Sequence, residues 1–251
     1  MHLPVILRIT GILLTLFSLV LILPVLVALI YGEDTTTTFG LAFGITLFAG
    51  LMLSLIKRRE RELRSGDGFL ITVLFYLGLG LFGAIPIYLA ESIGASFTDA
   101  AFESLSGLTT TGATVLSGLD DMPKSILFYR QLLQWLGGMG IIVLAVAILP
   151  MLGIGGMQLY RAESPGPVKD SKLTPRITET AKALWYLYLG LTVACAMSYW
   201  LAGMDLFDAI CHSFSTVAIG GFSTHDASIG FFDSPAIEGV AILFMIFAGI
   251  N

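Results

Sequence analysis

Long apolar stretches separated by short polar connections dominate the chain, and this pattern predicts membrane-spanning helices. A hydrocarbon core of about 30 Å requires roughly 20 apolar residues per helix. Six stretches meet this requirement, at about 3–31, 38–56, 69–90, 126–150, 183–203 and 235–251. The first is too long for the apolar core of a signal peptide, so we expect six spanning helices.

The composition supports the same interpretation. Apolar residues make up 56% of the chain and charged residues only 12%, whereas soluble domains carry about 25% charged residues. Water would not tolerate this much exposed apolar surface, so a soluble domain is excluded. The two cysteines, Cys195 and Cys211, lie in apolar surroundings and are expected to be small core residues.

The basic residues predict the orientation. Of 13 Lys and Arg residues, five follow the second stretch (Lys57, Arg58, Arg59, Arg61, Arg64), and five lie between the fourth and fifth (Arg161, Lys169, Lys172, Arg176, Lys182). Basic loops tend to remain cytoplasmic. The N-terminus is therefore expected in the cytoplasm, with segments 91–125 and 204–234 on the outer side.

A segment of the chain occurs twice, about 109 residues apart. Residues 99–112 read DAAFESLSGLTTTG, and residues 208–221 read DAICHSFSTVAIGG. Each copy lies between two apolar stretches, and its first part is too short to span a membrane. We therefore expect a half-helix that enters the membrane and is followed by non-helical backbone.

Both copies begin with signals for a helix N-terminus. Ser96 and Asp99 have the spacing of a capping box, and Asp205 and Asp208 repeat the arrangement. We expect these aspartates to cap the helices rather than to bind ions. A half-helix entering from outside points its partially negative C-terminus at the membrane centre, which favours a cation there.

The residues after each half-helix are the candidate ion-binding positions. They are Thr109, Thr110, Thr111 and Gly112 in the first copy, and Ala218, Ile219, Gly220 and Gly221 in the second. Non-helical backbone is tolerated at this depth only along a water-filled path or inside protein. Glycine permits positive φ, and backbone carbonyls can replace the hydration shell of K⁺. An ordinary extracellular loop is the alternative.

Further residues carry weaker signals. Gly137, Gly138 and Gly140 indicate either close helix packing or a hinge. Arg130 either reaches the membrane surface or pairs with an acid of the first copy. Glu103 and His212 occupy equivalent positions in the repeat, where we expect local hydrogen bonds rather than exposure to a vestibule.

Three motifs resemble the Trk/Ktr/HKT superfamily of potassium transporters, most closely its bacterial TrkH type. They are FESLSGLTTTG at 102–112, YRQLLQWLGGMG at 129–140 and AIGGFST at 218–224. The resemblance implies four helix–pore loop–helix units around one pore. It assigns K⁺-coordinating carbonyls to Thr110, Thr111, Gly112, Ile219, Gly220 and Gly221. It also implies a homodimer in the bacterial inner membrane and a cytosolic, nucleotide-binding regulatory subunit of the TrkA type.

The predicted organisation follows from these features. It comprises an N-terminal helix pair with its basic loop (1–68), a first helix–pore loop–helix unit (69–157), a cytoplasmic linker (158–182) and a second unit (183–251). Two units cannot enclose a fourfold pore, and the last apolar stretch reaches the final residue. We therefore expect a truncated chain.

The predicted function is K⁺ uptake through a carbonyl-lined filter. The alternative is a non-conducting half-pore or scaffold. An intramembrane enzyme that uses Ser104 or Ser213 with His212 is disfavoured, because the chain has neither a Gly-x-Ser-x-Gly nor a His-Glu-x-x-His motif.

Overall fold

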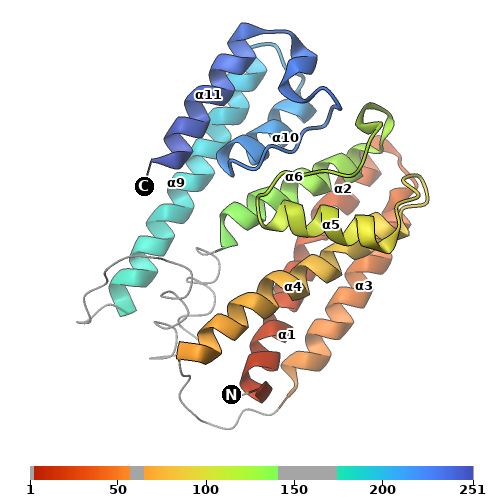
Figure 1. Ribbon diagram of the computed structural model, residues 1–251, viewed down its shortest axis with the longest axis vertical. Helices are drawn as coiled ribbons and strands as arrows, with labels where there is room; N and C mark the ends of the chain where they lie inside the picture. The colour runs from red at the N-terminus through yellow and green to blue at the C-terminus, as the bar shows by residue number, and fades with distance from the viewer. Residues whose placement is uncertain (1–2, 57–64, 141–173, 251) are drawn as a thin grey trace.

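The computed structural model describes residues 3–56, 65–140 and 174–250. Over these ranges the regular elements are helical (Figure 1), which confirms the predicted all-α class. The helices are α1 (Leu3–Val20), α2 (Ile22–Tyr31), α3 (Thr35–Ser54), α4 (Ser65–Leu89), α5 (Phe97–Leu108), α6 (Lys124–Gly138), α9 (Thr174–Leu201), α10 (Leu206–Val217) and α11 (Pro235–Gly249), with short 3₁₀ turns η1 (Leu119–Asp121) and η3 (Ser228–Phe232).

Within the described ranges, four segments are long and apolar enough to cross a membrane: Leu3–Tyr31, Thr35–Ser54, Thr72–Leu89 and Lys182–Leu201. They correspond to four of the predicted spans, and α11 is a shorter apolar helix in the sixth. The predicted span 126–150 begins within α6, but its positions 141–150 lie outside the described residues, as do most of the two basic loops.

The first span is interrupted at Leu21, which the sequence pattern did not predict. Pro24 has no backbone N–H, so it cannot donate to the carbonyl one helical turn earlier. At the break, the N–H of Leu21 donates to the carbonyl of Ser18 at 3.0 Å, a tighter turn than in an α-helix. The span therefore consists of α1 and α2 in succession.

Helices α1 and α3 pack closely through glycines. A Cβ on Gly11 would lie 2.5 Å from the backbone nitrogen of Ser54, and a Cβ on Gly50 would lie 2.7 Å from that of Thr15. Small residues at such crossings let two backbones approach within the membrane. This contact joins the N-terminal helix pair.

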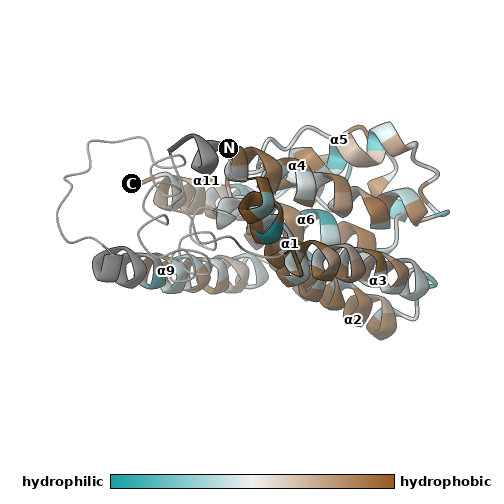
Figure 2. Cartoon of the chain, turned by 90° about the horizontal axis from the view of Figure 1, so that it is seen from below, coloured by the Kyte–Doolittle hydropathy of each residue, from teal (hydrophilic) through white to brown (hydrophobic). Residues whose placement is uncertain are grey.

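The described helices form two apolar cores. One contains residues of α1–α6, and the other contains residues of α9, α10 and α11. The connections that follow the spans ending in α2, α4 and α9 lie toward the end of the molecule opposite the N-terminus (Figure 1), as alternating spans require. Helices α1, α2 and α3 are mainly apolar along their length (Figure 2), and many of their large apolar side chains are exposed, as expected for helices surrounded by lipid.

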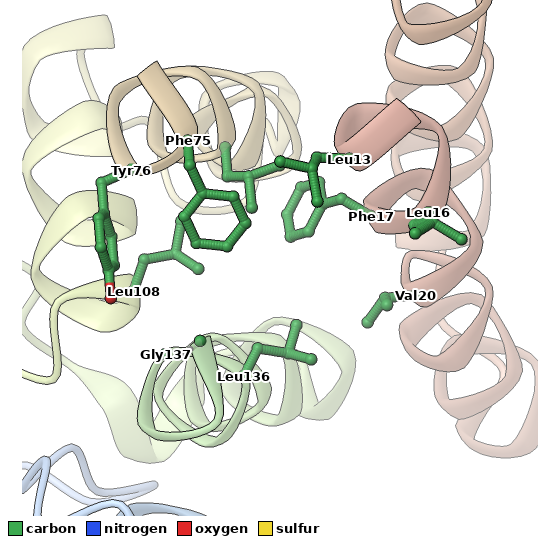
Figure 3. A pocket seen from close by; sticks show the side chains of 11 residues that line it. Leu13, Leu16, Phe17, Val20, Phe75, Tyr76, Leu108, Leu136 and Gly137 are labelled. Carbon is green, nitrogen blue, oxygen red and sulfur yellow. The ribbon is translucent and has the colours of Figure 1, made fainter. Parts of the chain in front are cut away.

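A cavity of about 90 Å³ opens between α1, α4, α5 and α6 (Figure 3). Apolar side chains line it, including Leu13, Phe17 and Phe75, and it reaches Leu108 at the end of α5 and Gly137 on α6. The first half-helix is therefore bordered on one side by an apolar space rather than by polar groups.

Candidate ion-conduction site

Helices α5 and α10 are the two predicted half-helices. Each has 12 residues, which at 1.5 Å per residue is about 18 Å, too short to cross the membrane. Ser96 and Asp99 form the predicted capping box, and Asp205 caps α10 by accepting the N–H of Asp208 at 2.7 Å. The prediction is confirmed for Ser96, Asp99 and Asp205, but Asp208 does not cap α10, because its carboxylate binds Thr224 and His225 instead.

The backbone follows the same course after both half-helices. We call residues 109–113 the first candidate segment and residues 218–222 the second. Thr110 and Ile219 have φ of 52° and 53°, and Gly112 and Gly221 have φ of 74° and 87°. Positive φ is uncommon for residues other than glycine, so its recurrence at matched positions is a specific structural repeat.

The hydrogen bonds that close the two half-helices are repeated as well. Thr111 donates its N–H to the carbonyl of Ser106 at 2.9 Å, and Gly220, 109 positions later, donates to Ser215 at 2.8 Å. The preceding residues of each segment also bond in the same register. These bonds use carbonyls of the last helical turn and leave the following backbone outside regular structure.

The two candidate segments meet. A Cβ built on Gly112 would lie 1.8 Å from the carbonyl oxygen of Gly220. Gln134 of α6 supports the contact from behind, since its Oε1 accepts the N–H of Phe222 at 3.0 Å. The same amide lies so close to Gly220 that a Cβ there would overlap it at 2.4 Å. A side chain at Gly112 would meet backbone, and one at Gly220 would displace the amide of Gln134.

A buried ion pair contacts the residues that follow the two segments. Arg130 of α6 and Glu103 of α5 have fully buried side chains, and Arg130 Nη2 lies 2.6 Å from Glu103 Oε1. Glu103 also accepts hydrogen bonds from the hydroxyl of Thr114 and the N–H of Val115, at 2.8 and 3.2 Å. Arg130 Nη1 donates to the carbonyl of Ser223 at 3.0 Å. The pair therefore connects the residues that follow both segments.

His212 replaces Glu103 in the second unit and performs an equivalent structural task. Its Nδ1 lies 2.9 Å from the carbonyl of Asp208, and its Nε2 lies 2.9 Å from the hydroxyl of Ser223. Because a carbonyl can only accept, Nδ1 carries the hydrogen and Ser223 donates to Nε2. The prediction of local hydrogen bonds for Glu103 and His212 is confirmed.

The three glycines on and after α6 lie at close contacts. A Cβ on Gly137 would be 2.2 Å from the carbonyl oxygen of Leu108, and one on Gly138 would be 2.6 Å from the hydroxyl of Tyr188. A Cβ on Gly140 would be 3.1 Å from the hydroxyl of Tyr76. Close packing accounts for these glycines, whereas the hinge remains a prediction.

The N-terminal helix pair holds the start of α6 through Glu33, a role that the sequence did not reveal. Glu33 Oε1 accepts the N–H of Lys124 at 2.6 Å, and Oε2 accepts the N–H of Ser125 at 3.0 Å. These amides belong to the first turn of α6, which has no cap of its own. A carboxylate at a helix N-terminus is stabilising, so a distant residue supplies the missing cap.

The geometry gives no support to the enzyme alternative. The hydroxyl of Ser213 donates to the carbonyl of Ile210, while both ring nitrogens of His212 are engaged elsewhere. Within the described ranges, His, Cys, Asp and Glu side chains form no group of three or more suited to a metal ion. The oxygen atoms of the two segments are those of the backbone carbonyls and, in the first segment, of the threonine hydroxyls.

The fold and the paired segments define an all-α integral membrane protein with an N-terminal helix pair and two helix–pore loop–helix repeats. A family model described as a cation transport protein, TrkH, matches residues 36–251, so the chain belongs to the TrkH family. The solved crystal structure of the potassium transporter TrkH from Vibrio parahaemolyticus is similar, with a TM-score of 0.85 and 56% identity, covering 100% of this chain and 50% of that one.

Relatives by sequence agree. The Trk system potassium uptake protein TrkH of Vibrio parahaemolyticus is 62% identical over 247 residues, 98% of this chain and 51% of that protein. The TrkH protein of Escherichia coli (strain K12) is 61% identical over 252 residues, 100% of this chain and 52% of its own length. The chain therefore spans about half the length of the relatives it matches.

Proposed function

We propose that this chain supplies two of the four units of a K⁺ uptake pore in the bacterial inner membrane, with the N-terminus in the cytoplasm. In this proposal, the backbone carbonyls of Thr110, Thr111 and Gly112 and of residues 219–221 replace water around K⁺, the transported ion. The C-termini of α5 and α10 contribute partial negative charge at the same place.

The observation that carries the proposal is the meeting of two matched segments. Gly112 and Gly220 come from different units, yet a Cβ on the first would overlap the carbonyl of the second at 1.8 Å. An ordinary pair of surface loops would not need matched positive φ and contact between their glycines. Potassium uptake in the names of the relatives supports the choice of ion.

Several features of the proposal come from the family. The complete transporter would be a homodimer, gated by a cytosolic nucleotide-binding subunit of the TrkA type that binds on the cytoplasmic side. Uptake would be driven by the membrane potential, which is worth about 2.3 kcal/mol per charge and 100 mV. Each segment has a single glycine motif, so selectivity against Na⁺ should be softer than in channels with a longer carbonyl filter.

Growth of a bacterial strain that lacks K⁺ uptake tests the function. The strain would express either this chain alone or the full-length protein, with expression checked in membranes. We expect the full-length protein to restore growth at limiting K⁺ and the chain alone not to do so. If the full-length protein reaches the membrane and gives neither growth nor uptake of the K⁺ analogue Rb⁺, the scaffold alternative replaces the proposal.

A further inference from the structure

A histidine between two carboxylates joins the outer ends of the two units. His225 lies in the connection after the second candidate segment. Its Nδ1 is 2.5 Å from Oδ1 of Asp120 in η1, and its Nε2 is 3.1 Å from Oδ2 of Asp208 in α10. Asp120 belongs to the first unit and Asp208 to the second. The imidazole is therefore a bridge between units.

The number of N–H groups on the imidazole decides whether both of its contacts are hydrogen bonds. A carboxylate accepts hydrogen bonds and cannot donate, and a neutral imidazole carries only one N–H. With a carboxylate oxygen beside each ring nitrogen, a neutral ring would place one nitrogen lone pair against an oxygen lone pair. Only the doubly protonated imidazolium satisfies both contacts of His225.

Neighbouring groups reinforce the bridge. The ring of Phe231 stacks on His225 with centroids 3.5 Å apart, which keeps the imidazole in place. Asp226 accepts the N–H groups of Gly118 and Leu119 at 2.9 and 3.2 Å, a second link between the units. The ionisable groups around His225 are mainly acidic: Asp120 from η1, Asp208 from α10 and Asp226 from its own loop. His212 of α10 is the other ionisable neighbour, and its ring centroid lies 6.4 Å from that of His225.

The bridge is also tied to the second candidate segment. The N–H of His225 donates to the hydroxyl of Ser223 at 3.1 Å, and Ser223 is bound to His212 and, through its carbonyl, to Arg130. Only residues 222–224 separate His225 from Gly221. His225 is therefore hydrogen-bonded to Ser223, which follows this segment directly.

We infer that His225 is a proton-binding site at the outer mouth, where the bound proton fastens the η1 turn of the first unit to the second candidate segment. Loss of this proton breaks one of the two carboxylate contacts and loosens the mouth. The chemical ligand of this site is H⁺ from the external medium. The consequence for transport depends on the proposed function, whereas the proton binding itself does not.

The pKa shifts have the sign that the geometry requires. Partial burial lowers the pKa of His225, but the hydrogen bonds and charges of Asp120 and Asp208 outweigh it and raise the pKa overall. The hydrogen bond from His225 lowers the pKa of Asp120. A raised histidine pKa stabilises the fold fully below the unfolded value of about 6.5, and this contribution is lost as pH rises through the folded pKa. At the acidic end, the bridge fails as pH falls through the lowered pKa of Asp120.

The test is an NMR titration of the histidine rings in the full-length protein, with the His225→Gln variant used to identify the His225 signal. We expect a pKa above 6.5 for His225. Asp120→Asn should lower this pKa, because it removes the carboxylate that accepts the hydrogen bond from Nδ1 and attracts the positive charge of the ring. Asp121→Asn is the matched control, because this neighbour takes no part in the bridge, and it should leave the pKa unchanged.

Rubidium uptake at varied external pH and fixed internal pH tests the consequence. Wild-type uptake should change with a midpoint at the pKa of His225, this change should be absent in His225→Gln, and Asp120→Asn should move the midpoint to lower pH. A His225 pKa at or below 6.5, or one that Asp120→Asn does not lower, overturns the proton site. Identical pH profiles of wild type and His225→Gln overturn its link to the pore. A shifted pKa in a protein without Rb⁺ uptake would instead refute the proposed function.

Discussion

Substitution of Gly112 by serine in the full-length protein tests the contact between the two candidate segments. The new Cβ would start 1.8 Å from the carbonyl oxygen of Gly220, whereas real Cβ contacts are essentially never below 3.0 Å. The segments must therefore separate by roughly 1.2 Å, the difference between these two distances. In addition, a left-handed conformation at a residue with a Cβ costs about 1–2 kcal/mol.

Serine substitutions at two other glycines distinguish the effect of backbone strain from the effect of steric overlap. Gly221 has φ of +87° in the second segment, and Gly118 has φ of +74° outside both segments. A Cβ on either residue would meet no atom of another part of the chain within 4 Å. Serine at each position therefore adds backbone strain without overlap. The comparison isolates the effect of moving the segments apart.

The assay is uptake of Rb⁺ and Na⁺ into proteoliposomes. We expect Gly112→Ser to lower the preference for Rb⁺ over Na⁺ at least tenfold, which corresponds to about 1.4 kcal/mol, because selectivity depends on the placement of the carbonyls. Gly221→Ser should lower it less, and Gly118→Ser should leave it unchanged. An unchanged ratio in Gly112→Ser, or an equal loss in Gly118→Ser, would refute this reasoning.

Three further substitutions test the supports of the site. Gln134→Leu should reduce Rb⁺ over Na⁺ selectivity and cost about 1–3 kcal/mol of unfolding free energy, because it leaves a buried N–H unpaired. Gln131→Leu is its control and should change neither, since both amide atoms of this buried residue lack a hydrogen-bond partner in the described structure. Glu103→Gln should destabilise the protein by about 3–5 kcal/mol by leaving a buried guanidinium without its counter-charge, measured by thermal unfolding in detergent; an unchanged melting temperature would contradict this. Glu33→Ala should cost about 1–2 kcal/mol as a lost helix cap, whereas Asp34→Ala, which removes no side-chain cap, should cost little in the same measurement.

The local parts of this structure can be predicted from the sequence. The half-helices are predictable because their signals are local: the length of the helical segment and its capping residues lie within a few neighbouring positions of the sequence. The repeat at an offset of 109 residues correctly indicates the half-helices and their caps. Pairing of Arg130 with an acid of the first unit is one of two expectations for this residue, and the bond to Glu103 decides between them.

The contacts between distant segments could not be predicted. Gln134 reaches Phe222, Glu33 reaches the start of α6, and Asp120 reaches His225 only because the helices bring them together. No periodicity or motif encodes such a pair in a single sequence. The break at Leu21 escapes prediction for a different reason, since Pro24 lies within an apolar run that otherwise has the length of a single spanning helix.

The central claim is that the two candidate segments hold a dehydrated alkali ion between them. The most direct measurement is a crystal structure of the full-length protein with Rb⁺, in which anomalous scattering locates the ion. We predict anomalous density at the backbone oxygens of residues 110–112 and 219–221. The account would be contradicted if a protein active in Rb⁺ uptake showed no anomalous density at these oxygens and bound Rb⁺ at another place along the pore.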